Sequence, residues 1–124
     1  MKQYDIEEYE TITGKTPFGE WLLNLKDERA QAKIRARIRR ASFGNFGDWK
    51  DIKGTKGIFE MREHYSPGYR IFYAIVGKKL VLLLAGSIKK DQKKTIVKAK
   101  EYLTDYVERT KPWQKKQADR LIKR

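Results

Sequence analysis

Two arginines interrupt an apolar stretch of the chain, and their type and spacing suit chemistry on a phosphate group. Arg62 and Arg70 flank residues 66–68, a Ser-Pro-Gly segment typical of a turn between paired strands. Both guanidinium groups are therefore expected near one end of the same sheet. Charge on a core sheet is costly unless it is paired or solvated. Arginine grips phosphate oxygens in pairs, and the competing structural interpretation is an ion pair of Arg62 with Glu60 or Glu63.

Cleavage of RNA without a metal needs a base for the 2′-hydroxyl, a cation for the charge on the phosphorane and an acid for the leaving oxygen. Cations that lie close together favour one another's neutral form, so Lys53 or Lys89 is a candidate base, with Arg62 as the stabilising cation. His64, the single histidine, is another candidate base, although a lone histidine beside a turn is more often simply exposed.

Other residues are candidates for binding RNA without taking part in the chemistry. The lysines contact phosphates and the tyrosines stack on bases, although core packing or turn capping is the competing role for each tyrosine. These candidates are Lys50, Lys90, Tyr65 and Tyr69.

The elements that position these residues can be predicted from periodicity. Residues 57–86 predict three consecutive antiparallel strands, joined by turns at residues 66–68 and at Gly77 and Lys78. Residues 80–85 are all apolar, which indicates a strand buried on both faces. The flanking elements are expected to be a strand within residues 1–12, a helix from Pro17 to about Lys26, a helix that begins at Asp27 and ends near Gly44, a short strand at residues 49–53, and a helix after Asp91.

The second of these helices is strongly basic. A narrow apolar stripe is flanked by six cationic side chains with no acid among them, namely Arg29, Lys33, Arg35, Arg37, Arg39 and Arg40. The functional interpretation is a helix that contacts phosphates, and the alternative is a merely solvated face. We assign Arg35, Arg37, Arg39 and Arg40 to docking on RNA phosphates without regard to sequence.

The charge of the chain is large and unevenly placed. The 124 residues carry a formal net charge of +13, of which residues 1–28 contribute −4 and residues 29–124 contribute +17. Such a field attracts polyanions, with nucleic acid as the first candidate and an acidic protein as the second. A basic surface without a specific ligand is the third interpretation.

Composition also excludes several classes of site. The chain has no cysteine and one histidine, so disulfides, thiolate metal sites and a histidine-built metal centre are not expected, and no cofactor is implied. The sequence contains no apolar run of the length that a membrane helix or a secretion signal needs. We therefore expect a cytoplasmic protein that has no membrane partner.

The domain organisation is expected to be a single domain over residues 1–107 followed by a basic extension over residues 108–124, partly helical or mobile. Pro112 is expected to interrupt any continuous helix there. The extension carries apolar residues that could anchor a further short helix, Trp113, Leu121 and Ile122, and basic residues assigned to phosphate docking, Lys115, Lys116 and Arg120.

Several strings spread over residues 9–106 together resemble a known family. They are TGKTPFGEWL, RIRRASFGNFGDWKDI, GIFEMR, PGYRIFY and LLLAG, and they are similar to the phage-related "addiction module killer protein" family of the RelE/ParE superfamily, close to HigB-like members. The resemblance implies an α+β fold of the RelE type: a twisted, mostly antiparallel sheet of about five strands, with two N-terminal helices and a C-terminal helix packed against it. It further implies helices on one side of the sheet and a basic concave face on the other.

The resemblance also implies a function. RelE-like and HigB-like members are toxins of type II toxin–antitoxin systems and cut mRNA on the ribosome as metal-independent endoribonucleases, whereas ParE-like members inhibit DNA gyrase. A non-catalytic RNA-binding domain on the same fold is a third alternative. The implied partners are the ribosome, mRNA and a cognate antitoxin, expected to be a helix-turn-helix protein with an acidic segment. Residue by residue, the family's basic positions fall on Arg62, Arg70, Lys89 or Lys90, Lys50 and Lys53.

Overall fold

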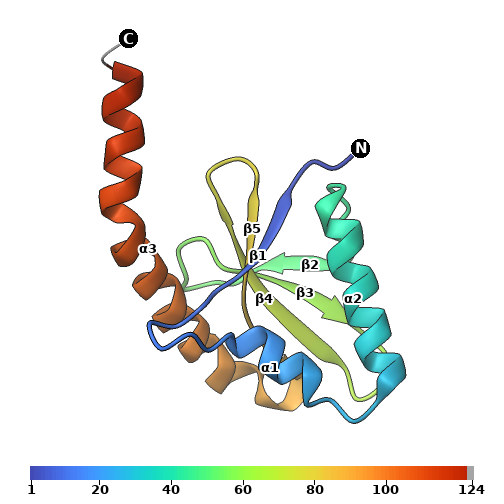
Figure 1. The fold of residues 1–124 in the computed structure, drawn as a ribbon. Helices are drawn as coiled ribbons and strands as arrows, with labels where there is room; N and C mark the ends of the chain where they lie inside the picture. The colour runs from blue at the N-terminus through green and yellow to red at the C-terminus, as the bar shows by residue number, and fades with distance from the viewer. Residues whose placement is uncertain (123–124) are drawn as a thin grey trace.

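A five-stranded sheet forms the centre of the protein (Figure 1). The structure, a computed structural model, describes the backbone of residues 1–122 and the side chains of residues 1–112. The strands lie in the order β1-β5-β4-β3-β2, and all neighbours are antiparallel except β1 and β5, which are parallel. Their bounds are β1 (Asp5–Glu8), β2 (Trp49–Asp51), β3 (Phe59–Glu63), β4 (Tyr69–Val76) and β5 (Leu80–Ile88).

Three α-helices accompany the sheet, in the order that periodicity predicts. They are α1 (Pro17–Leu23), α2 (Glu28–Ser42) and α3 (Gln92–Ile122), and a single 3₁₀ turn, η1 (Lys89–Asp91), leads from β5 into α3. The start of α2 has the expected chemical cause, because the Asp27 carboxylate accepts hydrogen bonds from the backbone N–H groups of Arg29 at 2.9 Å and Ala30 at 3.2 Å. The predicted α+β fold is therefore confirmed.

The two faces of the sheet are covered by different helices. Alternate residues of a strand point to opposite faces, and on β4 Ile71 and Tyr73 pack with the buried residues of α1 and α2. Phe72 packs instead with Ala99 and other residues of α3. The expectation of helices on one side only is therefore wrong, because the apolar stripe of α3 needs burial and finds it on the second face.

The close approach of α1 to β5 depends on a glycine. A Cβ atom at Gly86 would lie 2.2 Å from the Trp21 ring, so only glycine leaves room for that ring. Trp21 in turn lies edge-on to Tyr69, with 6.2 Å between the ring centroids. α1 is thus seated on the end of the sheet from which the β3–β4 turn emerges.

α3 is one helix from Gln92 to Ile122, with Pro112 inside it. The prediction that this proline interrupts the helix is wrong. A proline removes a single backbone donor from a helix, and the bonds on either side can hold the segment together. The side chains of the expected anchors and docking residues, Trp113, Lys115, Lys116, Arg120, Leu121 and Ile122, lie outside the described residues.

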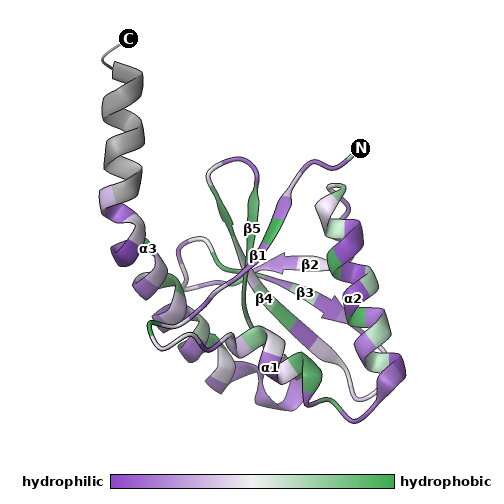
Figure 2. Cartoon of the chain, viewed as in Figure 1, coloured by the Kyte–Doolittle hydropathy of each residue, from purple (hydrophilic) through white to green (hydrophobic). Residues whose placement is uncertain are grey.

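Hydropathy follows these layers (Figure 2). Hydrophilic and hydrophobic bands alternate along α2, whose buried positions include Ala30, Ile34 and Ala41. Among the residues that the structure describes, no helix combines the length and the apolar character needed to cross a bilayer.

Candidate functional site

Arg62 and Arg70 lie directly opposite each other on β3 and β4. Directly opposed residues of an antiparallel pair project from the same face, and like charges in that position repel. The face is the one that Phe72 shares with α3, because Arg70 and Phe72 are two residues apart on β4. The turn at residues 66–68 thus brings the two guanidinium groups together as predicted, and the pair requires a compensating anion.

That anion is Glu60. Its Oε1 atom lies 3.2 Å from Nη2 of Arg62, and its Oε2 atom lies 3.4 Å from Nε of Arg70. The side chain of Glu60 is 3% exposed and that of Arg70 is 6% exposed, whereas that of Arg62 is 29% exposed. The predicted ion pair of Arg62 with Glu60 is present, and of the two arginines Arg62 is the one that a ligand can reach.

His64 lies just after β3 and bonds to a carboxylate that the sequence interpretation missed. Its Nε2 atom is within hydrogen-bond distance of Oδ2 of Asp48, and its side chain is 70% exposed. This hydrogen bond, with the nearby charges of His64 and Arg62, holds the pKa of Asp48 below its ordinary value. The backbone of Asp48 also accepts the Arg62 N–H at 2.8 Å, so the pair stands beside Arg62.

The candidate lysines are not all in one place. Lys50 lies opposite Glu60 in the register of β2 and β3, and therefore projects from the arginine face. Lys89 is held at the β3–β4 turn, because its backbone N–H donates to the Gly68 carbonyl at 3.0 Å. Lys90 follows it and is exposed. Lys53 lies beyond the end of β2, away from Arg62, so the structure does not bring this candidate base to the arginine pair.

The two candidate stacking tyrosines differ. Tyr65 is half-buried, with Nζ of Lys33 5.3 Å from the centre of its ring, and its hydrogen bond to Asp27 raises the pKa of its hydroxyl. Tyr69 is 4% exposed and belongs to the core with α1, and burial raises the pKa of its hydroxyl. Its predicted role in stacking on bases is therefore corrected to core packing, since its ring cannot be reached.

Three of the four arginines assigned to docking, Arg35, Arg39 and Arg40, are exposed on α2, but Arg37 is buried. Its guanidinium donates to the backbone carbonyls of Arg62, Phe46 and Asp48, the last two at 3.1 Å, and lies 3.7 Å from Glu63. Arg37 is therefore a structural residue, and its assignment to RNA docking is wrong. Its position in the sequence indicates this burial, because residue 37 lies three residues after Ile34 and four before Ala41, within the apolar stripe of the helix.

We call the cluster of Lys50, Glu60, Arg62, His64, Arg70 and Lys89 the basic face. The basic face consists of cationic or protonatable side chains at one end of the sheet, together with the buried carboxylate of Glu60. A set of this kind can bind a phosphodiester and stabilise charge that develops on it.

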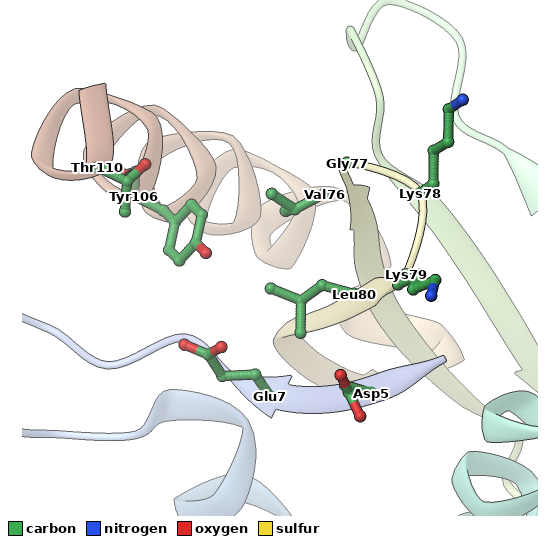
Figure 3. Close-up of a pocket in the computed structure, with 9 residues that line it drawn as sticks. All are labelled: Asp5, Glu7, Val76, Gly77, Lys78, Lys79, Leu80, Tyr106 and Thr110. Atoms are coloured by element: carbon green, nitrogen blue, oxygen red, sulfur yellow. Dashed lines mark hydrogen bonds between the residues drawn. The ribbon is translucent and has the colours of Figure 1, made fainter. Parts of the chain in front are cut away.

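A cavity of about 550 Å³ lies elsewhere, between the middle of α3, the β4–β5 turn and β1 (Figure 3). Val76, Leu80 and Tyr106 line it together with Asp5 and Glu7. Burial, and then the charge of Glu7, raises the pKa of Tyr106. Lys78 and Lys79 line it as well as the two carboxylates, and it lies at the β4–β5 turn, the end of β4 opposite to the β3–β4 turn, so the cavity is not part of the basic face.

Two comparisons with known proteins cover this region. A family model described as phage-derived protein Gp49-like matches residues 20–104. An uncharacterized protein of Haemophilus influenzae is 48% identical over 92 residues, which span 73% of this chain and 91% of that protein. The stretch matched by the family model runs from α1 into α3 and contains every residue of the basic face.

Proposed function

The chain belongs to the family of phage-derived Gp49-like proteins, and from this membership and the basic face we propose that it is the toxin of a toxin–antitoxin pair. We propose further that it acts as a RelE-like or HigB-like endoribonuclease that cuts mRNA on the ribosome. The observation that carries the proposal is Arg62, a cation at the exposed edge of an otherwise buried ion-pair cluster. Burying the charged partners of Arg62 costs free energy of desolvation, and a charged cluster kept at that cost favours a functional role.

The reaction needs no metal. His64 takes the proton of the 2′-hydroxyl through Nδ1, because Nε2 is engaged with Asp48, a contact that also holds the imidazole ring in place. The 2′-oxygen then forms a bond to phosphorus, and the bond from phosphorus to the 5′-oxygen breaks. Lys89 gives a proton to that leaving oxygen, which yields a 2′,3′-cyclic phosphate and a 5′-hydroxyl.

Arg62 stabilises the phosphorane between these two groups. Its guanidinium stays charged and offers paired N–H donors to phosphate oxygens. Removing one such donor from an electrostatic site costs on the order of 10²-fold in rate. In this proposal Lys50 and Lys90 contact flanking phosphates, and Lys89 and His64 can exchange the roles of base and acid without altering the part of Arg62.

Inducible expression with three separate readouts tests the proposal. Translation, mRNA integrity and DNA supercoiling are followed after induction of the wild-type chain and of Arg62→Ala. We expect growth arrest with broken mRNA and normal supercoiling for the wild type, and neither effect for the variant. Loss of supercoiling with intact mRNA would instead assign the chain to gyrase inhibition, and arrest without either change would point to RNA binding alone.

A further inference from the structure

Glu60 occupies an unusual position, because its carboxylate is buried in the sheet between two arginines of unequal exposure. A buried charge is retained only when it is paired. Here one carboxylate oxygen faces each arginine, so a single side chain links β3 to β4. The residue as a whole is 2% exposed, so it cannot touch a bound RNA itself.

We infer that Glu60 is a positioning residue, which holds the Arg62 guanidinium toward the phosphate and limits the charge of the basic face. This inference rests on the proposed function. Arg62 is attached by a flexible side chain, and one contact from Nη2 to Glu60 leaves the other edge of its planar group for a ligand. Preorganised donors of this kind act on the transition state because they need no rearrangement.

The same geometry explains the presence of Arg70. A pair of Glu60 with Arg62 alone would cancel the charge of Arg62, and a second cation restores a net positive charge to the triad. Arg70 is too buried to serve as the phosphate ligand. Its contribution therefore passes through Glu60 to Arg62, and we assign it to positioning rather than to contact with the substrate.

The triad is not closed on itself. Among the described residues, four buried polar atoms have no hydrogen-bond partner within the protein, namely Glu60 Oε2, Arg62 Nε, Arg70 Nε and Ser87 Oγ. Glu60 Oε2 and Arg70 Nε, 3.4 Å apart, interact as an ion pair. The hydrogen bond from Nη2 of Arg62 to Oε1 of Glu60, at 3.2 Å, is therefore the one hydrogen bond between members of the triad among the described residues.

The variant Glu60→Gln tests the inference, since it keeps the shape of the side chain and removes its charge. We expect two opposite effects: tighter binding of an all-2′-O-methyl RNA oligonucleotide, which cannot be cleaved, and a saturating rate of mRNA cleavage on ribosomes lower by about tenfold. The gain in affinity follows from the added net positive charge, and the loss in rate follows from an Arg62 that is no longer held. A structural role alone would move both quantities in the same direction or neither.

Glu63→Gln is the matched control. It makes the same change in charge on the same strand, but Glu63 lies 3.7 Å from Arg37 and accepts the Tyr65 N–H at 3.0 Å on the opposite face. We expect it to lower the melting temperature and to leave the rate at saturation unchanged. Equal effects of the two variants on rate and affinity would overturn the inference.

A readout independent of cleavage separates this inference from the proposed function. The NMR signals of the Nε–H groups of Arg62 and Arg70 should be distinct in the wild type, shifted and broadened in Glu60→Gln, and unaltered in Glu63→Gln. If the wild type cleaves no RNA but shows this pattern together with the change in oligonucleotide affinity, the proposed reaction fails and the positioning role stands. Unchanged arginine signals in Glu60→Gln would overturn it.

A second variant covers the case in which Glu60→Gln folds poorly. The double variant Glu60→Gln, Arg70→Gln restores the net charge of the triad and removes the unpaired buried cation. We expect wild-type affinity for the oligonucleotide and a rate of mRNA cleavage that remains low, because the carboxylate that orients Arg62 is still absent. Recovery of the wild-type rate in the double variant would contradict the inference, since charge balance alone would then explain the effect.

Discussion

Arg62 lies at the edge of a buried ion-pair cluster, and it is the residue on which the proposed chemistry depends most. Replacement by alanine should lower mRNA cleavage on ribosomes by about 10²-fold or more, because the charge of the phosphorane loses its donor. Arg62→Lys should recover little of the rate, since an ammonium lacks the planar fork. Cleavage by purified protein is the measurement. A folded Arg62→Ala protein that cleaves normally would remove Arg62 from the site.

For Arg37, in contrast to Arg62, we expect a substitution to affect the stability of the fold. Arg37→Met should destabilise the fold by about 3 kcal/mol, because it removes the cation that pairs with Glu63 and leaves three backbone carbonyls without their donor. Arg39→Met, on the exposed side of the same helix, should change the free energy of unfolding by no more than about 0.5 kcal/mol. Urea denaturation of both variants measures the difference, and equal stabilities would contradict the structural role of Arg37.

At the scale of elements, α3 is tied to the N-terminal segment by a polar contact. The Tyr9 hydroxyl donates to Asp105, and Arg109 donates to Asp105 and to the Glu10 carbonyl. The hydrogen bond from Tyr9, followed by that from Arg109, lowers the pKa of Asp105. A truncation of α3 that removes Arg109 would therefore disturb the packing of the helix as well as its charge.

This contact predicts a dependence of stability on pH. Because the pKa of Asp105 is depressed in the folded state, its contribution is present above the ordinary value of 3.8 and is lost as the pH falls through the folded value. The melting temperature of the wild type should therefore fall more steeply than that of Asp105→Asn below about pH 4. Glu101→Gln, at an exposed pair with Lys98 3.7 Å away, should follow the wild-type curve. Parallel curves for wild type and Asp105→Asn would show that the contact contributes nothing in solution.

At the scale of the whole molecule, the exposed arginines of α2 extend the positive field beyond the basic face. Replacing Arg35, Arg39 or Arg40 by alanine should weaken ribosome binding and reduce the log–log salt slope by roughly 0.7 to 0.9 for each phosphate that is no longer neutralised. Cleavage at saturation should stay normal. Lys78→Ala, in the β4–β5 turn, is the control. A salt slope that is unchanged in all three variants would mean that α2 presents a solvated face only.

Under the proposed function, the uneven charge also predicts how an antitoxin silences this protein. An antitoxin with an acidic segment should lie across the basic face, because residues 29–124 carry a net charge of +17. Ribosome binding is then blocked sterically. Titration of the toxin–ribosome complex with the antitoxin measures the competition. An antitoxin that binds the toxin and leaves its association with ribosomes intact would contradict this arrangement.

The sequence by itself determined the order and type of the elements. Continuous apolar residues marked β5, the carboxylate of Asp27 marked the start of α2, and the turn at residues 66–68 placed Arg62 and Arg70 at one end of the sheet. These features are local, since propensity, capping and turns depend on residues a few positions apart. The prediction of a paired Arg62 succeeded for the same reason, because Glu60 is its neighbour on one strand.

Only the tertiary structure decided which charges are free. Periodicity places Arg37 within the apolar stripe of α2, but it does not show what the side chain binds, because the carbonyls that accept its hydrogen bonds come from a loop and a strand elsewhere in the chain. The sharing of Glu60 by two arginines, the burial of Tyr69 and the place of α3 on the second face likewise depend on contacts between distant segments. A local pattern marks where a charged side chain lies on its element, and only folding brings to it the acceptor that decides whether the charge is paired or open to a ligand.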